Sequence, residues 1–155
     1  MKKQDYTSTI VVNSTAKEAF KCISRVSGWW TENVAGDSEN LNDIFTVNFG
    51  ETFVDFKVIE VIPVKKMVWL VTDCNLHWLS DKKEWKGTKV IFEISSENSA
   101  TEIKFTHLGL LPDIQCYNDC VKGWGQYVKD SLYKLITEGK GRPERKIPET
   151  ANASH

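Results

Sequence analysis

The sequence predicts an α+β fold in which a curved antiparallel sheet wraps around one long C-terminal helix. Apolar and polar residues alternate through consecutive segments between residues 43 and 110, a pattern that is typical of strands. Residues 113–139 instead place apolar side chains three and four apart, which indicates one long amphipathic helix. Consecutive strands with short links pair antiparallel, and a curved sheet that grips the helix covers the apolar faces of both.

A strand and a short helix are predicted before this series. Residues 6–12 predict the first strand. Thr15 and Glu18 form a capping box, which predicts the start of a helix. Gly28 ends or bends this helix just before the adjacent Trp29 and Trp30. Both indole rings need cover, because burying one ring removes roughly 150–250 Å² from water.

The central segments predict strands at residues 43–49, 52–58, 65–74, 87–95 and 101–110. The alternation fails over residues 59–63, which predicts a β-bulge before Pro63. The long helix is expected to begin near Asp113 and to end near Gly139, where glycine and proline stop it. We therefore expect a single domain over residues 1–139, followed by a polar C-terminal tail over residues 140–155.

Composition narrows the possible functions. The 155 residues carry a net charge of −1 with no long basic block, so no nucleic-acid partner is expected. Only Arg25, Arg142 and Arg145 are arginines, and bidentate anion clamps are therefore not expected. No membrane-spanning segment or signal peptide is apparent, which predicts a cytoplasmic protein with no membrane partner.

The four cysteines are expected to be unpaired thiols, as is usual in the cytoplasm. Cys116 and Cys120 share a helix face, but a metal site needs two further ligands that the sequence does not place nearby. No phosphate loop, dinucleotide motif or nucleophile elbow occurs either. We expect no metal, no cofactor and no catalytic residues.

Several segments in order resemble the START-like (SRPBCC, helix-grip) superfamily, which also includes the birch-pollen allergens and polyketide cyclases. They are SGWWT, VIEVIPVKKMVW, WKGTKVIFEI, TEIKFTHLGL and GWGQYVKDSLYKLITEGKG. Within it, the chain is similar to domains homologous to the C-terminal part of activators of the heat-shock chaperone ATPase. The resemblance implies the helix-grip fold, short helices that plug the open end of the sheet, and a role in the stress response. The N-terminal domain of full activators is absent from this sequence.

His107, Trp124 and the loop of residues 77–85 each have more than one interpretation. His107 is predicted to point inward, where its ring nitrogens either bind a ligand or are satisfied by the backbone. Trp124 lies between Gly123 and Gly125, which indicates close sheet packing, room for a ligand, or a locally distorted helix. The loop HWLSDKKEW, residues 77–85, is either an ordinary connection, a lid or a partner surface.

Two functions are therefore expected, with a weaker third. The first is a non-catalytic module that holds a small hydrophobic or amphipathic molecule between the sheet and the long helix. Its predicted ligand-binding residues are Trp30, Phe56, Trp69, Phe92, Phe105, His107 and Trp124. The second is a chaperone-associated protein-binding module, in which the inner aromatic residues only pack. The third, a polyketide cyclase or dehydratase-like enzyme, requires a polar pair inside the cavity.

Overall fold

The computed structural model describes residues 6–49, 51–76, 83, 85–97, 100–110 and 117–143. Its elements are, in chain order, β1 (Tyr6–Val12), α1 (Ala16–Ser24), α2 (Val26–Trp29), β2 (Val34–Gly36), β3 (Ile44–Phe49), β4 (Thr52–Ile62), β5 (Lys66–Asn75), β6 (Lys89–Glu97), β7 (Ala100–Leu108), α3 (Tyr117–Trp124), the π-helix η1 (Gly125–Leu132) and α4 (Tyr133–Glu138).

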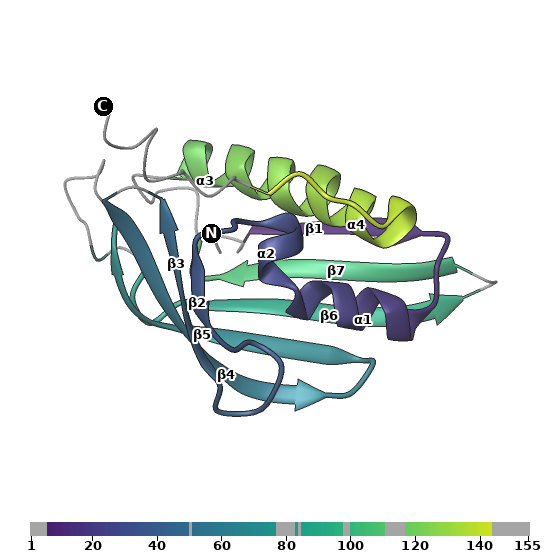
Figure 1. Cartoon of the computed structure of the whole chain (residues 1–155), viewed down its shortest axis with the longest axis horizontal. Coiled ribbons are helices and arrows are strands. Elements are labelled where there is room, and N and C mark those ends of the chain that lie inside the picture. Colours follow the sequence, from purple (N-terminus) through teal and green to yellow (C-terminus); the bar gives the residue numbers. More distant parts are fainter. Residues whose placement is uncertain are drawn as a thin grey trace, which may run out of the picture.

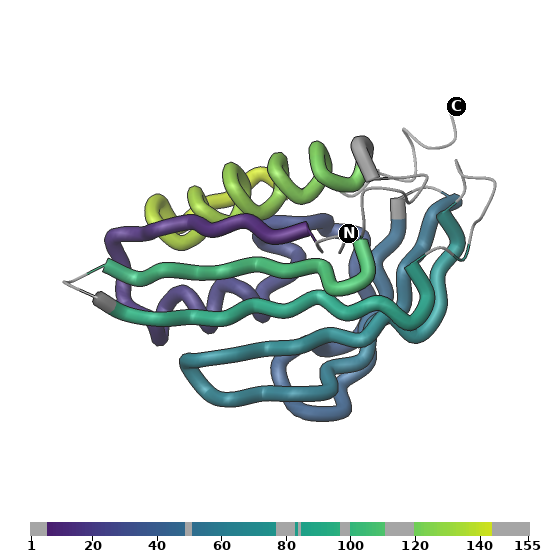
Figure 2. The backbone as a smooth tube through the Cα atoms, turned by 180° about the vertical axis from the view of Figure 1, so that it is seen from behind, coloured from purple at the N-terminus to yellow at the C-terminus, as the bar shows by residue number. Residues whose placement is uncertain are grey.

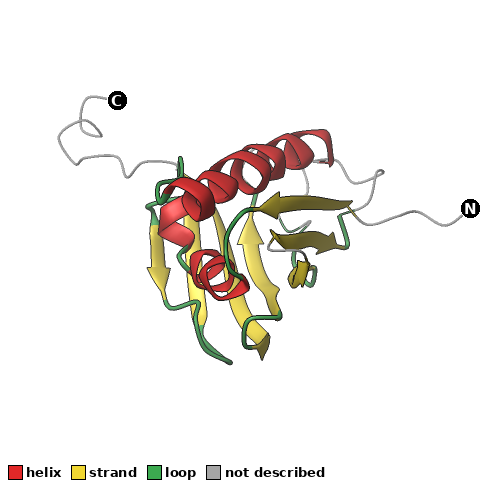
Figure 3. Cartoon of the chain, turned by 90° about the vertical axis from the view of Figure 1, so that its right-hand side faces the viewer, coloured by secondary structure: helices red, strands yellow, loops and turns green. Residues whose placement is uncertain are grey.

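The strands form one sheet in the order β1-β7-β6-β5-β4-β3-β2, and every neighbouring pair is antiparallel. Figure 1 shows all the helices on one face of this sheet, and Figure 2 shows the opposite face made of strands alone. The sheet curves around the helices when it is seen from the side (Figure 3). The predicted α+β class, with a curved antiparallel sheet and a long C-terminal helix, is confirmed.

The strand pattern explains the curvature. Along β4 the side chains alternate between buried and half-buried positions as far as Val58, as predicted. The register then shifts between Val58 and Glu60, which confirms the bulge expected in residues 59–63, and a second shift follows Asp55. Strand β2 was not predicted, because three residues are too few to display an alternation.

The N-terminal helix differs in one respect from its prediction. Thr15 accepts a hydrogen bond from the backbone N–H of Glu18 at 3.1 Å, so Thr15 is confirmed as the N-cap of this helix. Helix α1 ends at Ser24, before Gly28, because Arg25 leaves the helical conformation with φ −88° and ψ 68°. Gly28 lies inside the short helix α2, which carries Trp29 into the core.

The long C-terminal helix runs without a break through α3, η1 and α4. Its end is confirmed at Gly139, which adopts the left-handed conformation with φ 81°, while the predicted start near Asp113 lies outside the described residues. Close sheet packing at Gly123 and Gly125 is wrong, because nothing lies within 4 Å of a Cβ built on either glycine. The distorted-helix interpretation is confirmed instead, since the π-helix begins at Gly125.

Among the described helices, none is long and apolar enough to cross a membrane.

Residues 139–143, which we call the strap, turn back after α4 and lie along the helix (Figure 1, yellow). The buried Ser131 hydroxyl fixes the strap, because it donates to the carbonyl of Trp29 at 2.6 Å and accepts from the N–H of Arg142 at 2.7 Å. Gly141 lies so close that a Cβ there would come within 2.5 Å of the Gly28 carbonyl oxygen and 2.8 Å of that of Ser131. One hydroxyl and one glycine therefore join η1, α2 and the strap.

Replacing Ser131 by alanine tests this junction. Ser131→Ala leaves the Trp29 carbonyl and the Arg142 N–H without their partner, and we expect it to lower the free energy of unfolding by about 1–3 kcal/mol. Thr137→Ala is the control, because that exposed hydroxyl bonds only to the carbonyl one turn earlier in its own helix; its expected effect is within about 0.5 kcal/mol. Equal effects of the two substitutions in urea titrations would contradict the role given to Ser131.

Candidate functional site

The structure brings all seven predicted ligand-binding residues together in the core between the sheet and the long helix. Six of the rings form a closed cycle of contacts, with neighbouring ring centroids 4.7–5.6 Å apart. In order around the cycle they are Phe92, Phe105, Trp124, Trp30, Phe56 and Trp69. His107 joins it through Trp124, at 5.8 Å between centroids. None of the seven residues is more than 4% exposed.

Trp29 packs against one side of this cycle. Its ring contacts three members of the cycle, Trp30 at 5.9 Å, Trp69 at 6.4 Å and Phe92 at 6.0 Å between centroids. Its indole N–H donates to the Ile23 carbonyl at 3.1 Å, which ties the ring to helix α1. The adjacent tryptophans thus differ: Trp29 fills the core, and Trp30 packs between the sheet and the long helix.

Two further rings extend the cycle. Phe45 lies 5.0 Å from both Phe56 and Trp69. Trp85 stacks on Trp124 at 5.7 Å and meets the His107 ring edge-on at 4.6 Å. We call the complete set the aromatic cluster: Trp29, Trp30, Phe45, Phe56, Trp69, Trp85, Phe92, Phe105, His107 and Trp124.

A chain of hydrogen bonds crosses one end of this cluster. The indole Nε1–H of Trp124 donates to Nδ1 of His107 at 3.1 Å. An indole nitrogen can only donate, so Nδ1 carries no proton and the neutral ring holds its proton on Nε2. Nε2 lies 2.9 Å from Oγ1 of Thr88, to which it donates, and that hydroxyl donates to the Trp85 carbonyl at 2.6 Å.

Both nitrogens of His107 are thus bound by side chains, neither by the strand backbone nor by a ligand. The imidazole is fully buried, and burial lowers its pKa from 6.5 to about 3. The ring is therefore neutral at physiological pH and cannot act there as a general acid.

Three cavities lined by described residues lie away from the aromatic cluster. Their volumes are about 740, 430 and 480 Å³, and no member of the cluster lines any of these three. Within the described part of the chain, no group of three His, Cys, Asp or Glu side chains is placed to hold a metal ion.

Comparison with known proteins identifies the architecture. No family profile and no curated protein matches the sequence. Among solved structures, the Aha1 dimer from Colwellia psychrerythraea is similar with a TM-score of 0.73 and 20% identity, covering 89% of this chain and 99% of that one. The chain has the START-like helix-grip fold.

Two other solved structures show a similar likeness. DynU16, from the dynemicin biosynthetic locus, matches with a TM-score of 0.69 and 16% identity over 90% of this chain and 50% of that one. Protein MLL2253 from Mesorhizobium loti matches with a TM-score of 0.64 and 15% identity, over 84% and 96% of the two chains. The resemblance stated from the sequence is confirmed at the level of the fold.

Sequence reasoning missed residues that complete the START-like core. Trp85 was placed in a possible lid, but its ring is buried against His107 and Trp124. The sequence did offer one signal that this residue is buried, namely a large apolar ring inside an otherwise charged loop. Thr88 gave none, although its side chain lies so close to Gly109 that a Cβ there would come within 2.7 Å of it. Gly109 also has φ +105°, a conformation that favours glycine.

One polar atom of the cluster has no partner. The Nε1–H of Trp69 is buried and makes no hydrogen bond within the described structure. Leaving a buried donor unsatisfied costs about 1–3 kcal/mol relative to a paired one. A bound molecule that places a hydrogen-bond acceptor beside this N–H would therefore gain a hydrogen bond.

The cysteines differ from their prediction. Cys22 and Cys74 are free and buried, as expected. Burial, reinforced by a hydrogen bond to Glu18, raises the pKa of the Cys22 thiol to about 11, and burial also raises that of Cys74. Cys120 is disulfide-bonded, so the prediction of four unpaired thiols is wrong. Cys116 lies outside the described residues.

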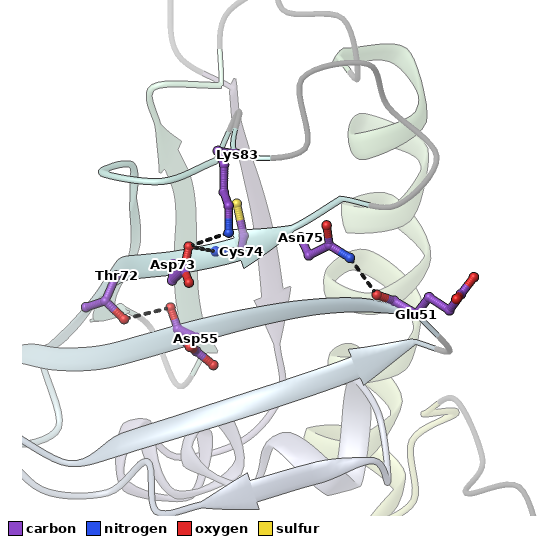
Figure 4. A network of polar contacts seen from close by, with 7 residues as sticks. All are labelled: Glu51, Asp55, Thr72, Asp73, Cys74, Asn75 and Lys83. Carbon is purple, nitrogen blue, oxygen red and sulfur yellow. Dashed lines mark hydrogen bonds and ion pairs between the residues drawn. The ribbon is translucent and has the colours of Figure 1, made fainter.

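A polar network on β4 and β5 fastens the connection that carries Trp85 (Figure 4). The Lys83 ammonium contacts the Asp73 carboxylate at 2.9 Å and lies 5.7 Å from the centre of the Phe53 ring. The hydrogen bond from Lys83 lowers the pKa of Asp73, so this carboxyl is ionised at neutral pH. Lys83 thus attaches the segment before β6 to strand β5 through Asp73, and Trp85 attaches the same segment to the core.

The buried histidine makes stability depend on pH. The unfolded chain protonates His107 below its ordinary pKa of 6.5, whereas the folded ring stays neutral down to about pH 3. The contribution of the neutral, buried His107 to the free energy of unfolding is fully present above pH 6.5 and is lost as the pH falls towards 3. Between pH 8 and pH 5 this loss amounts to about 2 kcal/mol.

Urea titrations of the wild type and of His107→Phe, at pH 8 and pH 5, measure this contribution. We expect the wild type to lose about 2 kcal/mol more than the variant over this interval, because phenylalanine binds no proton. Identical pH slopes for the two proteins would contradict the neutral, buried state of His107.

Proposed function

We propose that this START-like chain is a protein-binding module that acts through its outer surface on a protein of the heat-shock chaperone ATPase class. The observation that supports it is the aromatic cluster, a closed cycle of buried rings against which the buried Trp29 packs. An interior that is occupied by the protein's own side chains leaves recognition to the surface.

The state of His107 supports the same conclusion. As the expected polar anchor of an internal ligand, His107 would need a free ring nitrogen, but both nitrogens bond to Trp124 and Thr88. A ligand beside it would have to displace packed rings, and removing one large aromatic side chain from a core costs about 3–5 kcal/mol. The cluster therefore favours packing over ligand binding at this position.

Similarity to known proteins supports this class of partner. The solved structure named Aha1 is matched over 99% of its own length, and the sequence resembles the C-terminal part of activators of the heat-shock chaperone ATPase.

The experiment uses the heat-shock chaperone ATPase encoded by the same genome. We expect the purified chain to bind it in isothermal titration and to raise its rate of phosphate release, with DynU16 as a control of similar fold and different origin. If the chain neither binds this ATPase nor changes its rate, the proposed partner class is wrong.

A small hydrophobic or amphipathic ligand is the second candidate, and one observation favours it. The Trp69 N–H is buried in the cluster without an acceptor, so a ligand that carries a carbonyl or hydroxyl oxygen would gain a hydrogen bond there. A polyketide cyclase-like reaction has no such support, because the buried polar side chains among the described residues include no carboxylate or amine.

A pair of matched variants tests this candidate. Trp69→Phe removes an N–H without a partner, whereas Trp124→Phe removes the one that His107 accepts, so the second should destabilise more by about 1–3 kcal/mol. A thermal-shift screen of fatty acids, sterols and flavonoids should then raise the melting temperature of the wild type more than that of Trp69→Phe. Equal shifts, or none, would remove the ligand candidate.

A further inference from the structure

The largest of the three cavities described above lies at the C-terminal end of the long helix. Its volume is about 740 Å³, within the range of ligand pockets, and helix α2, helix α4 and the strap line it. Figure 1 shows the strap running back along the helix from the end of α4. We call this cavity the strap pocket.

Backbone geometry holds the strap pocket in shape. The Ser131 hydroxyl binds the Arg142 N–H and the Trp29 carbonyl, and Gly141 lies against the backbone of α2. The Arg142 side chain takes no part in this attachment, since only its backbone N–H is bonded. The pocket is therefore built by the main chain, while its side chains remain available for recognition.

Unpaired cations line this pocket. Within the described part of the chain, no ion pair engages Arg25, Lys140 or Arg142, while Lys134 is paired with Asp130 at 3.2 Å. Two of the chain's three arginines thus meet at one cavity, although they are 117 positions apart in sequence (142 minus 25). The small number of arginines predicted no bidentate anion clamp, and the inference below departs from that prediction because two of them line one pocket.

The chemistry around the pocket selects the ligand. Arginine forks bind carboxylates through two parallel hydrogen bonds. Helix α4 presents its C-terminal end here, where backbone carbonyls lack helical partners and accept N–H donors. A peptide supplies carboxylates to the arginines and several N–H groups to these carbonyls, whereas an inorganic phosphate has no N–H group and at most one or two O–H donors. The negative end of the helix disfavours either anion, so the arginine contacts and the N–H bonds have to outweigh this repulsion.

We propose that the strap pocket binds an acidic segment of a protein partner, with Arg25 and Arg142 contacting its Asp or Glu side chains. The inference rests on the proposed protein-binding function and adds the surface and the chemistry of recognition. Glu32 and Glu138 also line the pocket, and these two carboxylates limit the negative charge it accepts, which suits a peptide of spaced carboxylates.

The probe is a short, fluorescently labelled peptide rich in Asp and Glu, acetylated and amidated at its ends, with its Asn and Gln counterpart as the neutral ligand. We expect the acidic peptide to bind in anisotropy titrations, more weakly as salt rises. Arg25→Gln/Arg142→Gln should weaken it about tenfold or more, because two charge-assisted contacts are lost.

The control variant is Lys65→Gln/Lys104→Gln, which removes two charges from the 430 Å³ cavity on the outer face of the sheet. We expect it to bind the acidic peptide like the wild type. Equal weakening by both variants, equal binding of the neutral peptide, or no binding at all would overturn the inference. A lower melting temperature of the arginine variant with unchanged peptide binding would also overturn it, because the cations would then only compensate the helix dipole.

Titration of the chaperone ATPase with the same variants separates this inference from the proposed function. If the ATPase binds the wild type and the arginine variant equally, the strap pocket is wrong and the protein-binding function stands. If the acidic peptide binds the wild type in the expected way but the ATPase does not, the pocket stands and the partner class is wrong.

Discussion

The hydrogen bond from the Trp124 indole to Nδ1 of His107 is the contact on which the rest of the interior depends. It joins the long helix to the last strand inside a region from which water is excluded. It also fixes the tautomer of His107, and hence the direction of the bonds through Thr88 to the Trp85 carbonyl. Because Trp85 then stacks on Trp124, the chain of bonds returns to the helix from which it began.

The long helix is fastened at two positions by polar groups of different kinds. Towards its N-terminal end the attachment is between side chains, from Trp124 to His107. Towards its C-terminal end Ser131 binds two backbone groups, one in α2 and one in the strap. Between them the helix widens into a π-helix at Gly125. The first attachment closes the aromatic core, and the second shapes the strap pocket, where the unpaired arginines meet.

The sequence alone could predict the parts of this structure that follow from periodicity. Alternation placed His107 on the inward face, and glycine predicted the helix end at Gly139. The partners of His107 could not be predicted, since Thr88 lies 19 residues away and meets it only through strand pairing. For the same reason Ser131 gave no signal: its partner in α2 is 102 residues away. Long-range polar pairs depend on the tertiary structure, whereas a repeating apolar pattern is local.

The most direct test of a closed interior is the protonation state of His107, measured by nitrogen-15 NMR on the imidazole. The account predicts a neutral ring with the proton on Nε2, unchanged as the pH is lowered from 8 to 5, and a hydrogen-bonded indole N–H for Trp124. A ring that carries its proton on Nδ1, or that titrates near its ordinary pKa of 6.5, would contradict it.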